Sequence, residues 1–464
     1  MRRIAIALAC LVVGFGLVCH ADLPPGLARI AQEAGLRHAT IAIYAAYVSG
    51  GQPLLAHNQE LLLVPASGMK LLTTSAALDL LGPEYRHRTV LRAEWADGKG
   101  TLSAIGGGDP LLDTTDLDAM VTRLCEAGMP DGLDVTLDLS RYGGETFAPG
   151  WQLDDLGYYY LPTLSALAVG KNVVEVFVSP GDPPRATVVP QYGEVRFEGG
   201  AGPLSVVREP GRDVYVVRGA VPAGHATDKP VQALSIADPT PWATHWLRSA
   251  LARVPAGSPR QDGKAEVVHE GKPLFEIVQA INKPSDNFLA EMLFLELGYA
   301  RTGLGSFRSG TEAVLAFARK AGLASDAVRV GDGSGLSRLN LVTAGSMVAL
   351  LRYAPRQPWG DAFRESIPLA GKEGTVAKRL SDLVGRVRAK TGTMGGACSL
   401  SGYVWTKSGR VAAFCIIVNH GDTAAARRLQ DETVRWLYRD QEAREWFKQV
   451  TARRTSSSTP SKDR

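Results

Sequence analysis

The sequence predicts a multidomain α+β protein in which a β-rich segment interrupts a domain of helices and strands. At 464 residues the chain is too long for one simple hydrophobic core, so two or three domains are expected. Helix-like segments occur before about residue 90 and after about residue 265, whereas proline and glycine are dense among short β-like runs between them. Hydrophobic residues make up 45% of the chain and charged residues 21%, which is typical of a soluble globular protein.

Residues 1–21 have the pattern of a secretory signal peptide. Arg2 and Arg3 precede the apolar run IAIALACLVVGFGLV, and small residues precede a cleavage point after Ala21. The run is short for a transmembrane helix. We therefore expect an exported protein, with an uncleaved membrane anchor as the alternative.

Two strands and a helix are predicted next. The stretch ATIAIYAAYVSGGQPLLAHN, residues 39–58, contains two apolar runs around the turn SGG, which indicates a β-hairpin. A helix is expected over 67–81, because Gly82 and Pro83 then end it. These elements belong to the first part of a discontinuous domain, residues 22–90.

Residues 91–264 are predicted to form one or two inserted, mostly β subdomains. Runs such as VVEVFVSP and DVYVVRGAV alternate with turn-forming segments such as PGDPPR and EPGRD.

The second part of the discontinuous domain is expected over residues 265–445. The residue pattern of 272–298 again predicts helix. Two strands around the turn KSG are predicted within 386–421, followed by an amphipathic helix at 423–441. The Ser/Thr-rich basic tail, residues 451–464, is expected to be disordered.

Charge and cysteine content exclude several classes of protein. The formal charge of +4 resides mostly in the signal segment and the tail, so no nucleic-acid footprint is visible. The eight histidines show no metal-binding spacing, and neither a metal nor a cofactor is predicted. Outside the signal segment the cysteines are Cys125, Cys398 and Cys415, which permit at most one bridge; whether Cys398 and Cys415 pair is open.

Ser67 and Lys70 are the first candidate catalytic pair. Residues at i and i+3 share a helix face, so Lys70 can reach the Ser67 hydroxyl. The alternative is that Ser67 is only an N-cap. However, a capping box prefers Glu or Gln at the position of Lys70, and a cation is unfavourable at the positive end of a helix dipole. The same field would lower the pKa of the lysine and help it to accept a proton.

The stretch KPSDNFLAEML provides a second candidate motif. Ser285, Asp286 and Asn287 open a helix, and capping alone would explain this composition. The serine hydroxyl could also relay a proton to a leaving group, and the amide of Asn287 could hold a substrate peptide.

A third motif lies at Lys390, Thr391 and Gly392, at the start of a predicted β-hairpin. The strand edge offers a cation, hydroxyls and backbone N–H groups, and Gly392 lets a ligand approach the backbone. This suits a peptide that ends in a carboxylate and pairs as an added strand. An exposed lysine beside a strand-end glycine is the simpler alternative.

Taken together, S-x-x-K, S-D-N and K-T-G each occur once and in this order, which is the signature of serine β-lactamases and penicillin-binding proteins. The long spacing between Ser67 and Ser285 resembles the class C low-molecular-mass penicillin-binding proteins, the D-alanyl-D-alanine carboxypeptidase/endopeptidase family. The stretches GGGDPLL, PGWQLDDLGYYYLPTLSAL, VGDGSGLSR and PLAGKEGTVAKRL resemble this family too. The resemblance covers about residues 30–440 and implies a β-lactamase/transpeptidase-like domain, an antiparallel sheet flanked by helices, with a β-rich insertion.

The resemblance also implies the catalytic roles. Ser67 would attack the carbonyl between two D-alanines and form an acyl-enzyme, with Lys70 taking its proton. Ser285 would protonate the departing D-alanine, Asn287 would hold the substrate backbone, and Lys390 would supply positive potential.

Substrate-binding roles follow in the same way. Thr391 and Thr393 would bind the terminal carboxylate, and the backbone N–H groups of Ser67 and Thr393 would form the oxyanion hole. Asp155, in WQLDDL, resembles a family acid that faces the cleft and contacts an amino-bearing side chain of the substrate; a surface aspartate is the alternative.

The implied partners are peptidoglycan stem peptides and β-lactam antibiotics as covalent inhibitors, in the periplasm. A β-lactamase-like hydrolase and a catalytically silent sensor of wall peptides or antibiotics are the competing functions. Peripheral membrane association, oligomeric state and the balance between carboxypeptidase and endopeptidase activity are open at this point.

Overall fold

The computed structural model describes residues 23–145, 147–255 and 257–457, and for 450–457 the backbone alone. The predicted signal peptide, residues 1–21, lies outside these ranges. Within them, no helix is both long and apolar enough to cross a membrane.

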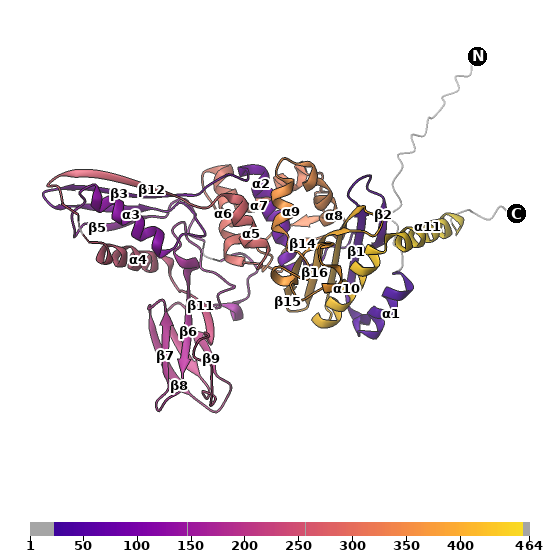
Figure 1. Ribbon diagram of the computed structural model, residues 1–464, viewed down its shortest axis with the longest axis horizontal. Coiled ribbons are helices and arrows are strands. Elements are labelled where there is room, and N and C mark those ends of the chain that lie inside the picture. Colours follow the sequence, from indigo (N-terminus) through magenta and orange to yellow (C-terminus); the bar gives the residue numbers. More distant parts are fainter. Residues whose placement is uncertain (1–22, 146, 256, 458–464) are drawn as a thin grey trace, which may run out of the picture.

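A five-stranded antiparallel sheet organises the C-terminal half of the molecule together with the first strands of the chain (Figure 1). Its strands, in spatial order, are β15 (Val387–Met394), β16 (Ala397–Trp405), β17 (Val411–Asn419), β1 (Thr40–Tyr47) and β2 (Pro53–His57). The predicted hairpin at 39–58 is confirmed as β1 and β2. The chain forms three strands within 386–421 rather than the predicted two, because the turn at Gly395 and Gly396 separates β15 from β16.

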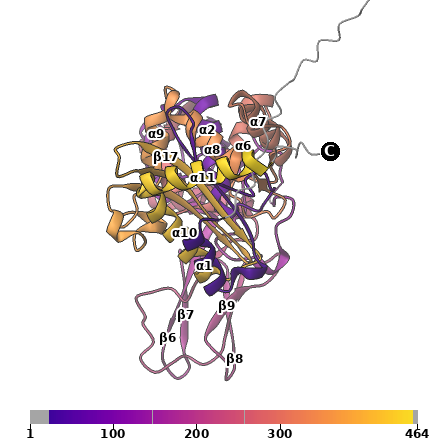
Figure 2. The same cartoon turned by 90° about the vertical axis from the view of Figure 1, so that its right-hand side faces the viewer.

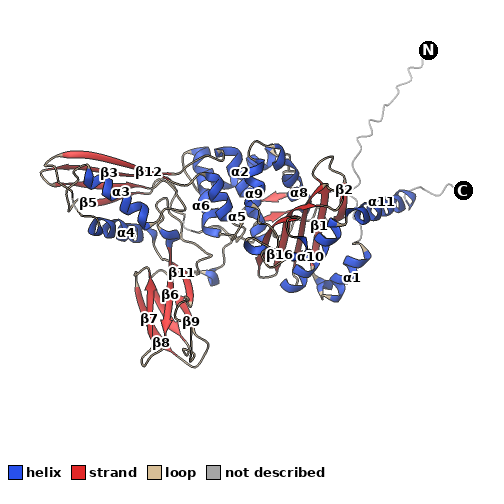
Figure 3. Ribbon diagram, in the orientation of Figure 1, coloured by secondary structure: helices blue, strands red, loops and turns tan. Residues whose placement is uncertain are grey.

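Helices cover both faces of this sheet, as Figures 2 and 3 show. Alternate residues of β1 enter different cores: Ile41 and Ile43 face one, whereas Ala42 and Ala46 face the other. The first core is closed by the terminal helices, which are α1 (Pro25–Glu33), α10 (Thr423–Tyr438) and α11 (Asp440–Ser457). The second is closed by a helical layer, whose members are α2 (Lys70–Leu81), α5 (Leu274–Asn282), α6 (Asn287–Thr302), α7 (Phe307–Lys320), α8 (Ala344–Tyr353) and α9 (Gly360–Ser366).

The three cysteines outside the predicted signal segment are free and buried. Cys398 packs in the core under α10, whereas Cys415 packs in the core under the helical layer. The two side chains therefore lie on opposite faces of the sheet and do not form a bridge.

The chain between α2 and α5 forms a separate β-rich region with its own core. A four-stranded sheet consists of β12 (Gly263–Glu270), β3 (Arg88–Ala96), β4 (Lys99–Ile105) and β5 (Asp134–Asp138). It packs with α3 (Thr114–Glu126) and α4 (Pro239–Arg253). The predicted domain limits, 90/91 and 264/265, fall inside β3 and β12, which pair with each other. The division at these limits stays a prediction.

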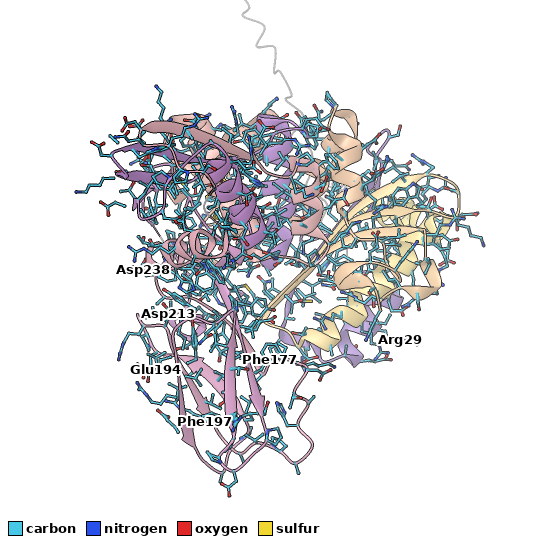
Figure 4. The ribbon with its side chains drawn as sticks, turned by 60° about the vertical axis from the view of Figure 1, so that its left-hand side comes forward. Arg29, Phe177, Glu194, Phe197, Asp213 and Asp238 are labelled. Atoms are coloured by element: carbon cyan, nitrogen blue, oxygen red, sulfur yellow. The ribbon has the colours of Figure 1, made fainter. Side chains whose placement is uncertain are left out.

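Two three-stranded sheets project from this region (Figure 4). The first contains β11 (Gln232–Ser235), β6 (Val173–Ser179) and β7 (Arg185–Val189), and the second contains β8 (Glu194–Gly199), β10 (Val214–Arg218) and β9 (Ser205–Arg208). Asp213, labelled in Figure 4, precedes β10 and accepts a hydrogen bond from the backbone N–H of Ala237 (2.7 Å), in the segment between β11 and α4.

The C-terminal end differs from the expectation. Helix α11 runs to Ser457, so the backbone of 451–457 is helical within the segment expected to be disordered, whereas 458–464 lie outside the described residues. Alanine and arginine are good helix formers, and a helix already nucleated at Asp440 extends through them at little cost.

Candidate active site

Ser67 lies in a tight 3₁₀ turn, η2 (Ala66–Met69), that leads directly into α2. Its side chain makes no capping hydrogen bond, and the N-cap position of α2 is Met69, so the interpretation of Ser67 as a helix cap is wrong. The backbone of Ala66 has φ = 46°, an unusual value for a non-glycine residue. Such local strain is found where a fold holds a functional side chain in a fixed direction.

The edge strand β15 crosses this turn closely at Gly392. A Cβ atom added there would lie 2.3 Å from the carbonyl oxygen of Pro65 and 2.9 Å from the backbone nitrogen of Gly68. Only glycine permits this approach, so the K-T-G motif is held beside Ser67 by backbone packing.

Lys70 is fully buried beneath Ser67. Its Nζ donates hydrogen bonds to Ser67 Oγ (2.9 Å), to Asn287 Oδ1 (2.7 Å) and to the carbonyl oxygen of Ser334 (2.7 Å). Burial lowers the pKa of Lys70 to about 8, against the opposing effect of Glu291 and other acids nearby. The predicted direction is therefore correct, but desolvation is its main cause. A lysine with this pKa is neutral often enough near pH 8 to accept the proton of a serine.

The three residues of the S-D-N motif have different contacts. Asp286 caps α6 by accepting a hydrogen bond from the backbone N–H of Leu289 (2.9 Å), and it pairs with Lys171 at 2.7 Å. The capping alternative thus applies to Asp286 alone. Ser285, with φ = 70°, and Asn287 are left to face the cleft.

Asn287 is fixed in one orientation by two opposite partners. Its Nδ2 donates to the carbonyl oxygen of Tyr160 at 2.7 Å, while its Oδ1 accepts from Lys70. Because a carbonyl can only accept and the lysine here donates, the amide has one satisfactory orientation.

Lys390 is the second fully buried lysine of the site. Its Nζ donates to Ser285 Oγ (2.7 Å) and to the carbonyl oxygen of Thr391 (2.7 Å). Burial, assisted by the charge of Lys70, holds the pKa of Lys390 well below its usual value. Two lysine–serine pairs, Lys70 with Ser67 and Lys390 with Ser285, therefore converge on one cleft.

The cleft contains a pocket of about 560 Å³. Among the predicted site residues, those that line it are Ser67, Ser285, Asn287, Thr393 and Asp155. Asp155 Oδ1 accepts a hydrogen bond from the hydroxyl of Tyr160 at 2.8 Å, so this acid is held at the cleft rather than free on the surface. Thr391 lines an adjoining pocket that shares Ser67 and Ser285.

Three contributors to the site were not predicted: the carbonyl oxygens of Tyr160 and Ser334, and the carboxylate of Glu291. Glu291 is fully buried and accepts hydrogen bonds from the backbone N–H groups of Gly333 (2.9 Å) and Ser334 (2.8 Å). The spacing of Asn287 and Glu291, one helical turn apart, is the signal that could have identified the glutamate. Within the described ranges, no cluster of three or more His, Cys, Asp or Glu side chains could hold a metal ion.

Comparisons with known proteins identify the family. The model of the D-Ala-D-Ala carboxypeptidase 3 (S13) family matches residues 24–440. A D-alanyl-D-alanine carboxypeptidase from Actinomadura sp. is 32% identical over 453 residues, which cover 88% of this chain and 83% of the relative. The D-alanyl-D-alanine carboxypeptidase DacB of Haemophilus influenzae is 26% identical, over 82% of this chain and 85% of its own.

Solved structures share the fold. The crystal structure of penicillin binding protein 4 from Haemophilus influenzae matches with a TM-score of 0.77 at 24% identity, covering 89% of this chain and 99% of that one. The same protein has also been solved in complex with a β-lactam. This likeness confirms the predicted transpeptidase-like fold.

Proposed function

The chain belongs to the D-Ala-D-Ala carboxypeptidase 3 (S13) family, and we propose that Ser67 is its nucleophile. It is a serine-type D-Ala-D-Ala carboxypeptidase that acts on peptidoglycan. The observation that carries the assignment of Ser67 is the 2.9 Å hydrogen bond between its Oγ and the buried Nζ of Lys70. A base with a lowered pKa in direct contact with a hydroxyl is the arrangement that activates a serine.

The proposed reaction begins with proton transfer from Ser67 Oγ to Lys70. The Oγ attacks the carbonyl carbon between the two D-alanines, and the backbone N–H groups of Ser67 and Thr393 bind the oxyanion. The C–N bond then breaks, and the departing amine takes a proton through Ser285, which Lys390 contacts at 2.7 Å. Water hydrolyses the acyl-enzyme and releases the shortened peptide.

Substrate recognition is proposed to use both sides of Ser67. Thr391 and Thr393 bind the terminal carboxylate, and the substrate lies along the edge of β15, where Gly392 permits close approach. Asp155, in the pocket on the acyl side, binds an amino group on the stem peptide. β-Lactams would acylate Ser67 in the same position, and cross-linked peptides are a second substrate class. Export to the periplasm, which the signal segment favours, is part of this proposal.

One experiment tests the assignment and separates it from the alternatives. The mature protein is incubated with a fluorescent penicillin, with Ser67→Ala as control, and D-alanine release from a wall pentapeptide is followed. We expect a covalent label on the wild type alone and D-alanine release by the wild type alone. An unlabelled wild type would overturn the assignment of Ser67.

The remaining outcomes identify the competing functions. A label that turns over in seconds without D-alanine release would indicate a β-lactamase, and stable labelling without peptide turnover would indicate a sensor. The geometry gives the β-lactamase little support, because fast deacylation needs a carboxylate that activates water. Asp155 is the one carboxylate among the described residues that line the pocket, and Glu291 instead accepts hydrogen bonds from the backbone N–H groups of Gly333 and Ser334.

A further inference from the structure

A second pocket, of about 370 Å³, meets the first at Ser67 and is not lined by Asp155. It shares Ser67, Ser285 and Thr393 with the first pocket and adds Lys378, Arg379 and Arg427. The hydroxyl of Thr391, on its wall, donates to that of Thr375 at 2.7 Å. No carboxylate lines this pocket among the described residues.

The three cations of this pocket differ in their partners. Arg379 is neutralised by Asp431, at 2.7 Å, and also donates to Gln430. Lys378 and Arg427, in contrast, are exposed and form no ion pair within the described part of the chain. Arg427 instead reaches over the strand edge, with its Nη2 3.5 Å from Thr393 Oγ1.

The two buried lysines, Lys70 and Lys390, do not line this pocket. An arginine keeps its charge at any pH at which an enzyme works, and its planar group suits a carboxylate. The exposed positive charge of this pocket therefore comes from Arg427 and Lys378.

The first pocket is therefore lined by one acid, Asp155, and one base, Arg338, whereas the charged side chains that line the second pocket are all basic. Resting on the proposed function, in which Thr391 and Thr393 hold the terminal carboxylate, we propose that Lys378 and Arg427 form a subsite for a further carboxylate on the leaving group. The ligand is an acidic residue or peptide bonded through its amino group to the penultimate D-alanine. When Ser67 Oγ forms its bond to the carbonyl carbon and the C–N bond breaks, this acidic amine departs with the proton delivered through Ser285.

The test compares two leaving groups of equal size. Donor peptides that end in D-Ala–D-Glu and in D-Ala–D-Gln differ by one charge, and kcat/KM is measured for each by release of the free amino acid. We expect the wild type to favour the glutamate peptide by roughly 10-fold, as two solvated charge-assisted contacts would give. The preference should fall as salt is raised, because exposed charges are screened.

Variants assign the effect to these two residues. Lys378→Ala combined with Arg427→Ala should bring the ratio close to one, whereas Arg428→Ala, which removes an exposed neighbouring charge outside the pocket, should keep it. A wild-type ratio near one, or a ratio unchanged in the double variant, would overturn the subsite. Labelling of every variant with fluorescent penicillin separates the two proposals: loss of the wild-type label refutes the role of Ser67, whereas a retained label with no charge preference refutes the subsite alone.

Discussion

At the scale of single residues, the distinctive feature of this site is a lysine held in contact with a serine by burial. Lys70 is fully enclosed, and its three acceptors leave the Nζ directed at Ser67. Desolvation disfavours the charged form, which lowers its pKa to about 8. The fold therefore holds a lysine whose neutral form is populated near pH 8 in contact with a serine hydroxyl.

This pKa makes the acylation rate depend on pH. Only neutral Lys70 can accept the proton of Ser67, and its neutral fraction rises about tenfold per pH unit below the pKa. We expect the rate constant for acylation by a penicillin to rise from pH 6 and to level off above about pH 8. Stopped-flow labelling between pH 6 and 10 measures the profile, and a rate constant that does not change from pH 6 to 9 would exclude Lys70 as the base.

Gly392 permits a sharp substitution at the same scale. The Cβ of Gly392→Ala would lie 2.3 Å from the carbonyl oxygen of Pro65 and 2.4 Å from Ser399 Oγ, so β15 must move away from the turn that carries Ser67. We expect a loss of stability of about 1–3 kcal/mol and a fall in acylation of roughly 100-fold or more. Gly202→Ala, where an added Cβ meets open space, is the matched control for urea unfolding and labelling.

At the scale of elements, helix α6 contacts both Lys70 and the loop at 331–338. Asn287 and Glu291 lie one turn apart on this helix; the first contacts Lys70 directly, and the second holds the backbone whose Ser334 carbonyl accepts from Lys70. Burial and the neighbouring Asp332 raise the pKa of Glu291, and the charge of Glu291 in turn opposes the lowering of the pKa of Lys70. Glu291 is therefore a positioning residue that also biases the charge of Lys70.

Removing this carboxylate should alter both stability and the pH profile. Glu291→Ala leaves two buried N–H groups without their acceptors, each at a cost of about 1–3 kcal/mol. Because Glu291 raises the pKa of Lys70, the midpoint of the acylation profile should also move to lower pH. Urea unfolding and labelling from pH 6 to 10 measure the two effects, with exposed Glu276→Ala as control; a midpoint that stays in place would leave Glu291 a structural role only.

At the scale of the whole molecule, the sequence predicted the side chains of the candidate site better than the backbone groups that hold them in place. Ser67, Lys70, Ser285, Asn287 and Lys390 stand in motifs whose residue types are informative in themselves, and the structure brings them together. The carbonyl oxygens of Tyr160 and Ser334 could not be predicted, because every residue has a carbonyl and only the tertiary fold decides which one faces Asn287 or Lys70. The extra strand near Gly395 was missed because a two-glycine turn inside an apolar run carries a weaker signal than KSG.

A loop of the β-rich region lines the cleft, and this leads to a last prediction. The loop that carries Asp155 and Tyr160 is held to β11 by the hydrogen bond from the backbone N–H of Ser235 to the carbonyl of Gly157 (2.8 Å) and by the bridge between Tyr158 and Leu234. Tyr160 in turn orients Asn287. This loop therefore links the β-rich region to the amide of Asn287, and it also carries Asp155.

Leu234 is almost fully buried, so Leu234→Ala should cost about 2–5 kcal/mol locally and loosen this loop. Peptides with an amino-bearing side chain would then lose contact with Asp155, whereas a penicillin, which lacks that group, would depend on the loop through Asn287 alone. We expect kcat/KM for the pentapeptide to fall several-fold more than the rate of penicillin acylation. Phe197→Ala, on β8 and partly exposed, is the control. Equal losses for both substrates would show instead that the loop supports the catalytic centre as a whole and does not select the peptide.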